Sequence, residues 1–292
     1  MPTKQRKIEV HRLTISGLPN GTGYGPFLHS LRNNRPVATM VMKSGGKSHA
    51  LNDTALLNHR LRLRFLSFTK GHRPDILDTA EFSVQENPLT PNQTSIEWTH
   101  ALGALKGGRY VLLIEHNHNG IWPSTMEGYL QWLIDEYYQP SPETEQQDGE
   151  PVTVSIEAEP GPEFVERMDA LEHVTEATLR IVRPNPGWYD LETELGEKAE
   201  ESDAHKVDIK MTARRRASLS KNTGILGRIR EAFQKKELGF AAVTGRRGRR
   251  KESFTTERLG KHFFVNIEMD DRGQIRAGDA WHRLSEIIDD LD

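Results

Sequence analysis

Residues 109–138 read RYVLLIEHNHNGIWPSTMEGYLQWLIDEYY, and this stretch decides the fold class. Residues 109–116 carry a continuous apolar run, which is typical of a buried central strand or a short buried helix. The polar turn 117–120 follows it. Ser124 or Thr125 can then cap a helix that runs to about Tyr138. Apolar side chains recur at helical spacing on one face of this helix: Met126, Tyr129, Leu130, Leu133 and Ile134.

The same mixture of elements continues on both sides of this stretch. Residues 60–68 (RLRLRFLSF) alternate between apolar and basic side chains, which is the pattern of a half-buried strand. The basic face, formed by Arg60, Arg62 and Arg64, is common on nucleic-acid-binding surfaces and equally common on a plain solvent-facing strand. Residues 206–212 alternate as well. We therefore expect an α+β fold, with two mixed α/β domains that each contain a mostly antiparallel sheet and packed helices.

A polar, proline-bearing segment separates the two expected domains. Residues 139–151 (QPSPETEQQDGEP) have no apolar anchor and are typical of a linker. The sequence therefore predicts an N-terminal α/β domain at residues 1–140, a linker at 141–151 and a C-terminal α/β domain at 152–292.

Charge is segregated along the chain. The 292 residues contain 39 Lys and Arg against 42 Asp and Glu, for a formal net charge of −3. Residues 141–205 nevertheless have a net charge of −14, and residues 206–261 have a net charge of +12. The basic segment 206–261 predicts binding to a polyanion. Its candidate nucleic-acid-binding residues are Arg214, Arg215, Arg216, Lys221, Arg228, Arg230, Lys235, Lys236, Arg246, Arg247, Arg249, Arg250 and Lys251.

Few aromatic side chains accompany these cations. The basic segment contains Phe233, Phe240 and Phe254, which are too few for a base-stacking platform. The pattern instead favours contacts to the phosphate backbone with little base specificity. The Gly/Arg-rich residues 245–251 are expected to form either a mobile arm that inserts into a groove of the nucleic acid or an exposed hairpin tip.

Two other functions stay open at this point. Asp208 and Lys210 alternate along the strand 206–212 as in the last part of a PD-(D/E)xK nuclease site, where a carboxylate holds a divalent metal and a lysine positions the attacking water. Asp190 would be the second acid of such a site. The other alternative is a protein-interaction module, in which the acidic block 141–205 docks against a basic partner or against the basic segment of another subunit.

Several classes of site and of location are excluded by composition. The chain has no cysteine, so it has no disulfide, no cysteine-ligated metal and no cysteine nucleophile. His116, Asn117 and His118 are contiguous and lack a third metal ligand nearby, and no cofactor-binding motif is complete. No apolar run approaches the roughly 18 residues that span a bilayer. The expected protein is cytoplasmic, without a metal, a cofactor or a membrane partner.

The segment TLRIVRPNPGWYD, residues 178–190, carries a resemblance. With its Arg183-Pro184-Asn185-Pro186 turn and the following strand KVDIKMT, it resembles a family of uncharacterised bacterial proteins that are associated with phage defence. That family is similar in turn to the RexA exclusion protein and to the KwaB component of Kiwa defence. The resemblance implies DNA binding in phage defence, with dimerisation. It carries over no catalytic residue, because its shared motif is a structural turn.

Together, these observations predict a homodimeric, sequence-nonspecific DNA-binding protein that acts in phage defence or a related DNA transaction. RNA is the second polyanion that the same cations would accept, and a protein of the same defence system is a further expected partner.

Overall fold

The computed structural model describes residues 2–19, 21–33, 35–71, 75–90, 92–139, 151–182, 202 and 206–291. These residues form five α-helices and fourteen strands, and the helices pack against antiparallel sheets. The fold is therefore α+β, as the sequence predicts. Among the described helices, none has both the length and the apolar composition needed to cross a bilayer.

The chain divides into two compact units, and neither is one continuous stretch. Unit 1 contains Met1–Ile8, Gly17–Val154 and Phe264–Asp292, whereas unit 2 contains Glu9–Ser16 and Ser155–Phe263. This division differs from the predicted domains, because the last part of the chain falls in unit 1. The physical reason is strand pairing: β14 (His262–Glu268) pairs with β1 (Thr3–Ser16) in the large sheet. The predicted linker, Pro151 excepted, lies outside the described residues.

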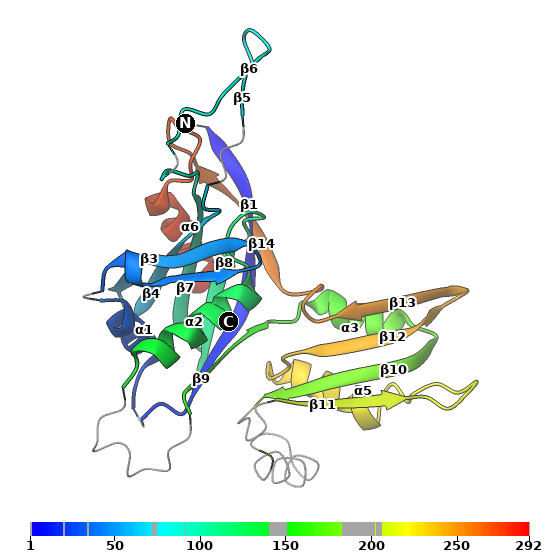
Figure 1. The fold of residues 1–292 in the computed structure, drawn as a ribbon. Helices are drawn as coiled ribbons and strands as arrows, with labels where there is room; N and C mark the ends of the chain where they lie inside the picture. The colour runs from blue at the N-terminus through cyan, green and yellow to red at the C-terminus, as the bar shows by residue number, and fades with distance from the viewer. Residues whose placement is uncertain are drawn as a thin grey trace. The chain divides into compact units, whose positions relative to one another are not determined.

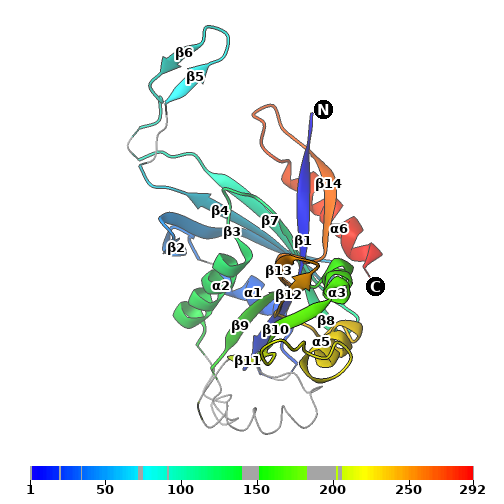
Figure 2. The same ribbon diagram turned by 90° about the vertical axis from the view of Figure 1, so that its right-hand side faces the viewer.

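Unit 1 is a sheet with helices on both faces. The strand order is β14-β1-β8-β7-β4-β3-β2, and β9 (Thr153–Ala158) also pairs with β1. Parts of β1, β9 and β14 belong to unit 2. The other strands are β2 (Val41–Ser44), β3 (Lys47–Leu57), β4 (Arg60–Phe68), β7 (Glu97–Lys106) and β8 (Arg109–Glu115). Figure 2 shows α1 (Tyr24–Arg32) and α2 (Pro123–Tyr137) on one side of the sheet and α6 (Ala277–Asp290) on the other. The 3-10 helix η1 (Val37–Thr39) precedes β2, and β5 (Ile76–Asp78) pairs with β6 (Ser83–Gln85) in a separate hairpin.

Apolar and basic side chains alternate along β4, so this strand has one apolar face and one basic face. Leu61, Leu63 and Phe65 are fully buried, and Phe65 packs edge-on against Tyr129 of α2. The arginines between them point to the opposite face. Helix α2 begins at Pro123, after Trp122, and no side chain caps its N-terminus. The cap expected at Ser124 or Thr125 is therefore not formed, since proline at the start fixes the helix entry.

Tyr129 anchors α2 to the sheet through a buried hydroxyl. The hydroxyl donates to the carbonyl of Met40 (2.8 Å) and accepts from the amide of Leu51 (2.9 Å). Burial raises the pKa of Tyr129 from 10.0 to about 12. Because the folded state favours the neutral phenol, this stabilisation is complete below pH 10 and is lost as the pH rises through 12.

We therefore predict that Tyr129→Phe loses about 1–3 kcal/mol of unfolding free energy at pH 8, since the variant leaves the buried Leu51 amide and Met40 carbonyl without partners. The difference from the wild type should shrink between pH 10 and pH 12, because the Tyr129 phenol ionises in the unfolded wild type over this range while the folded state keeps it neutral, and the variant has no phenol at position 129. Urea unfolding at a series of pH values measures both effects. A difference that stays constant up to pH 12 would contradict the assigned pKa.

Unit 2 contains a four-stranded sheet in the order β11-β10-β12-β13. Its strands are β10 (His173–Val182), β11 (Lys206–Thr212), β12 (Ala241–Arg247) and β13 (Arg250–Thr255). Two helices, α3 (Pro162–Ala170) and α5 (Gly224–Gln234), pack on one face of this sheet (Figure 1). The core between them contains Phe164, Met168, Leu179, Leu226 and Phe254. The other face of the sheet is polar, because the alternate residues of each strand carry charged or hydroxyl side chains.

Candidate nucleic-acid interface

The Gly/Arg-rich residues 245–251 form the tip of a β-hairpin, which is the second of the two expected arrangements. The pairing of β12 with β13 runs to the tip, where Arg246 lies opposite Lys251 and Arg247 lies opposite Arg250. Gly248, with φ at 60°, makes the turn that a side chain would disfavour. Side chains on opposing strand positions share a face of the sheet. The hairpin therefore presents two cations on each face.

A second basic cluster lies at the same end of the sheet. β12 ends where Arg246 pairs with His173, the first residue of β10. β11 ends at the same place, with Thr212 opposite Glu176, and the chain continues along β10 through a bond from the Ala213 amide to the Thr175 carbonyl (2.9 Å). Figure 1 shows the turn after β11 and the tip of β12 and β13 at one end of the sheet.

We call this surface the basic end. All of its side chains are exposed, and no acidic side chain of the described residues forms an ion pair with any of them. Such a concentration of unpaired cations creates a positive potential that attracts polyanions. The basic end consists of Arg214, Arg215, Arg216, Arg246, Arg247, Arg249, Arg250 and Lys251.

The other candidate cations lie elsewhere or are occupied. Arg230 makes two hydrogen bonds to Asp169 (2.5 and 3.0 Å), which lower the pKa of that carboxyl, and Lys221 donates to the Asp169 carbonyl (2.9 Å). These contacts join α5 to the end of α3. Lys235 pairs with Glu231 (2.8 Å) and, with Lys236, follows the C-terminal end of α5, which is the end away from the basic end. Arg228 lies on α5 between the two ends.

The residues of the alternative nuclease site are not brought together as a metal site in the described chain. Asp208 accepts two hydrogen bonds from Arg180 (2.7 and 2.9 Å), which raise the pKa of Arg180, and Lys210 pairs with Glu176 (3.0 Å). Asp190 lies outside the described residues. Within the residues described, no group of three or more His, Asp or Glu side chains is placed to hold a metal ion.

The arginines of β4 do not form a basic surface. Arg64 lies 3.9 Å from the centre of the Trp98 ring, and Arg62 lies 5.2 Å from that of Trp281 on α6. Arg60 pairs with Asp289 of the same helix (2.5 Å). Helix α6 therefore covers this face, and the sequence alone could not show it because α6 is more than two hundred residues away.

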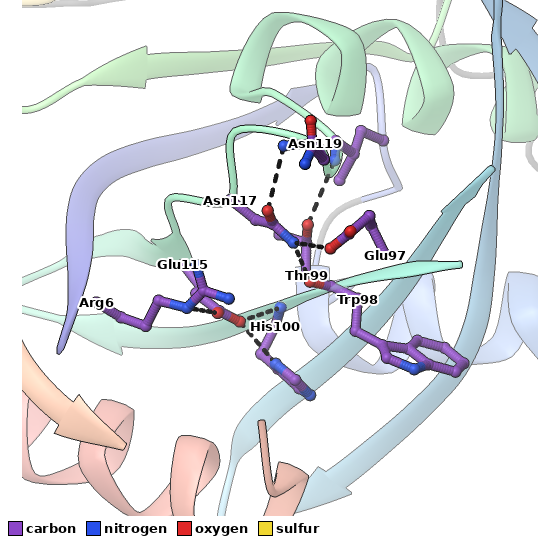
Figure 3. A network of polar contacts seen from close by, with 9 residues as sticks. Arg6, Glu97, Trp98, Thr99, His100, Glu115, Asn117 and Asn119 are labelled. Atoms are coloured by element: carbon purple, nitrogen blue, oxygen red, sulfur yellow. Dashed lines mark hydrogen bonds and ion pairs between the residues drawn. The ribbon is translucent and has the colours of Figure 1, made fainter. Parts of the chain in front are cut away.

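A buried polar network in unit 1 has no counterpart in the sequence analysis (Figure 3). Glu115 is 1% exposed; it accepts a hydrogen bond from Nδ1 of His100 (2.7 Å) and pairs with Nε of Arg6 (3.0 Å). His100 itself is fully buried. A carboxylate and a histidine this close often serve in catalysis, but here no solvent reaches either group. The network therefore ties β1, β7 and β8 together.

The turn that follows β8 extends this network. Asn117 donates to the Trp98 carbonyl (2.8 Å) and to Glu97 (3.2 Å), which fixes the turn against β7 (Figure 3). Gly120 is needed there, because a Cβ at this position would come within 2.1 Å of the Thr99 hydroxyl. The histidines on either side of Asn117 pack edge-on against Trp122, with ring centres 5.1 and 5.8 Å away.

Comparison of the sequence with protein-family models and with curated proteins finds no match.

Proposed function

We propose that this protein binds nucleic acid, in the first place DNA, through the phosphates, with the basic end as the contact surface. One observation supports the proposal most directly. Two clusters of cations that are about thirty residues apart in the sequence meet at one end of a four-stranded sheet, without described acidic partners. Neutralising these cations individually would need many counterions, whereas a phosphate backbone neutralises them together and releases those ions.

The shape of the basic end supports contact with a duplex. A two-stranded β-ribbon fits the major groove of B-form DNA, and the tip of β12 and β13 is such a ribbon. Arginine at the tip can reach phosphates on both sides, since Arg246 and Arg247 point to opposite faces. Phe254 is buried in the core, so it offers no ring to a base. Phosphate contacts dominate in this arrangement, which implies weak dependence on sequence.

Salt dependence tests this proposal. If the basic end makes about 6–8 phosphate contacts, the affinity for a 20-base-pair duplex should fall about 10³–10⁴-fold between 50 and 200 mM NaCl. Fluorescence anisotropy with duplexes of two unrelated sequences measures the slope, and both duplexes should give the same one. A flat salt response, or no binding at 50 mM NaCl, would refute the electrostatic mechanism.

The same samples test the nuclease alternative. Incubation of the duplex with the protein and Mg²⁺ should leave the DNA intact, because the carboxylate of Asp208 is held by Arg180. Cleavage that Asp208→Asn removes would favour the nuclease. The roles in phage defence and as a homodimer stay predictions. Plaque counts on cells with and without the protein, and its mass in solution, are the measurements that bear on them.

A further inference from the structure

An open groove of about 500 Å³ lies beside β13, within unit 2. We call it the β13 groove. Its volume is in the range of sites that hold small organic ligands, about 300–1,000 Å³. Three of its side chains are cationic and one is a carboxylate. The lining residues are Arg167, Arg247, Lys251, Glu252, Ser253 and Phe254.

The backbone of β13 contributes hydrogen-bonding groups to this groove. β13 is the edge strand of its sheet. The amide of Thr256 donates to the carbonyl of Ala241 (2.9 Å), which sets the hydrogen-bonded positions of the pair. Because these positions alternate in an antiparallel ladder, the N–H and C=O groups of Lys251 and Ser253 point away from β12. The hydroxyl of Ser253 lies 3.0 Å from that of Thr244 on the polar face of the sheet, so β13 contributes backbone groups here.

Two arginines are suited to one phosphate group. Arg247 belongs to the basic end and lies on the same face of the hairpin as Glu252, whereas Lys251 lies on the opposite face with Arg246. Arg167 reaches the groove from α3; its Nε and Nη2 donate to Glu163 (2.9 and 2.6 Å), and the described residues leave its Nη1 without an acceptor. Guanidinium groups form charge-assisted hydrogen bonds to phosphate oxygens and are a common type of phosphate site.

Glu252 makes the groove unsuitable for a purely anionic ligand. Its cross-strand neighbour on β12 is Gly245, which has no side chain to cover it, and no described cation forms an ion pair with it. A carboxylate accepts hydrogen bonds and donates none. The ligand that satisfies the groove therefore has a phosphate at one end and N–H donors at the other.

We propose that the β13 groove binds an unpaired guanine nucleotide, with its phosphate on Arg167 and Arg247 and its base on Glu252. Guanine presents two neighbouring N–H donors, on N1 and on the exocyclic nitrogen, which match the two oxygens of one carboxylate. Adenine, cytosine and uracil each offer a single N–H donor group on the edge of the base that forms Watson–Crick pairs. The nucleotide must be unpaired, because base pairing occupies the same edge. This proposal rests on the proposed function and adds a base preference at the end of a strand or in a single strand.

Titration calorimetry on the full chain tests the proposal with four free probes: 5′-GMP, 5′-AMP, guanosine and inorganic phosphate. We expect 5′-GMP to bind at least about tenfold more tightly than each of the other three. Glu252→Gln should remove the preference for 5′-GMP over 5′-AMP, since an amide replaces one acceptor by a donor. Glu257→Gln, an exposed position beyond β13, is the matched control and should keep the preference.

A second experiment tests whether the groove also binds a nucleotide that is part of a strand. Thymidine octamers that carry one terminal guanine or one terminal adenine are compared by anisotropy, and the guanine octamer should bind more tightly in the wild type only. Equal binding of both octamers and of both free nucleotides would overturn the proposal. If the protein binds duplex DNA but shows no preference for guanine, the proposed function is retained and the groove proposal is rejected. If the protein binds no nucleic acid at all, both proposals are rejected. A preference for 5′-GMP without any duplex binding would support the groove and reject the proposed function.

Discussion

The double variant Arg215→Glu and Arg216→Glu should bind duplex DNA on the order of 10²–10³-fold more weakly than the wild type at 100 mM NaCl. Each lost phosphate contact forfeits the release of about one counterion, and each new carboxylate repels a phosphate. Both residues are exposed and form no ion pair with the described residues, so the fold should not change. Anisotropy gives the affinity, and thermal unfolding checks stability.

The chain offers a closely matched control. Lys235→Glu with Lys236→Glu makes the same change of charge in the same basic segment, but beyond the far end of α5. The backbones also match, because Arg216 and Lys236 both have positive φ, at 65° and 58°. We expect this control to lose less than about tenfold in affinity. If both variants weaken binding equally, net charge and not the basic end determines affinity.

Removal of Glu115 should destabilise unit 1 by about 3–5 kcal/mol. Glu115→Ala leaves the fully buried His100, and Arg6 with a side chain only 16% exposed, without their carboxylate. Breaking one partner of a buried charged cluster costs far more than the cluster contributes, because the remaining charge is poorly hydrated. Urea unfolding measures the loss of unfolding free energy, and a loss of this size lowers the urea concentration at the midpoint of unfolding.

Glu286 provides the comparison on the surface. It pairs with Arg283 (3.0 Å) and with His282 (3.3 Å), the same two residue types that Glu115 contacts, but its side chain is 49% exposed. Glu286→Ala should cost less than about 1 kcal/mol, since water replaces the lost contacts. Similar losses in the two variants would show that the network of Glu115 is hydrated and not closed.

Strands with one apolar and one polar face could be predicted closely from the sequence. β4 and β11 begin and end where their alternation begins and ends, because burial on one side imposes a period of two. The helix that follows residues 117–120 could also be predicted from its spacing, whereas the apolar run of residues 109–116 is compatible with a strand or a short helix and forms the strand β8.

β7 could not be predicted in this way. Six consecutive residues from Thr99 to Ala104 are buried, so both faces of the strand are covered and polarity does not alternate. β3 is also obscured, because its pairing with β4 shifts between Leu51 and Asp53 and interrupts the period. In both strands, helices distant in the sequence decide which residues are covered.

The region before α5 shows where the sequence misleads. The sequence predicts helix over residues 213–237 in two pieces with a break near residues 222–224, but the described helix begins at Gly224. The Ala217 amide instead bonds to the Arg214 carbonyl in a turn, and the Leu219 amide bonds to Val174 of β10. Strand edges compete with the helix for these amides. The density of cations in the sequence predicts a polyanion site. Which of these cations lie close together is decided by the pairing of β10 with β11 and β12, which the sequence alone does not show.

The interleaved order of the two units has a consequence for synthesis on the ribosome. All residues of unit 2 precede position 264, so this unit can complete its sheet while the last part of the chain is still being made. Unit 1 has to wait, because β14 and α6 are translated last and α6 covers the face that holds Arg62 and Arg64. The half that starts first therefore finishes folding last, and until then the face of its sheet that α6 covers is open to a nascent-chain chaperone.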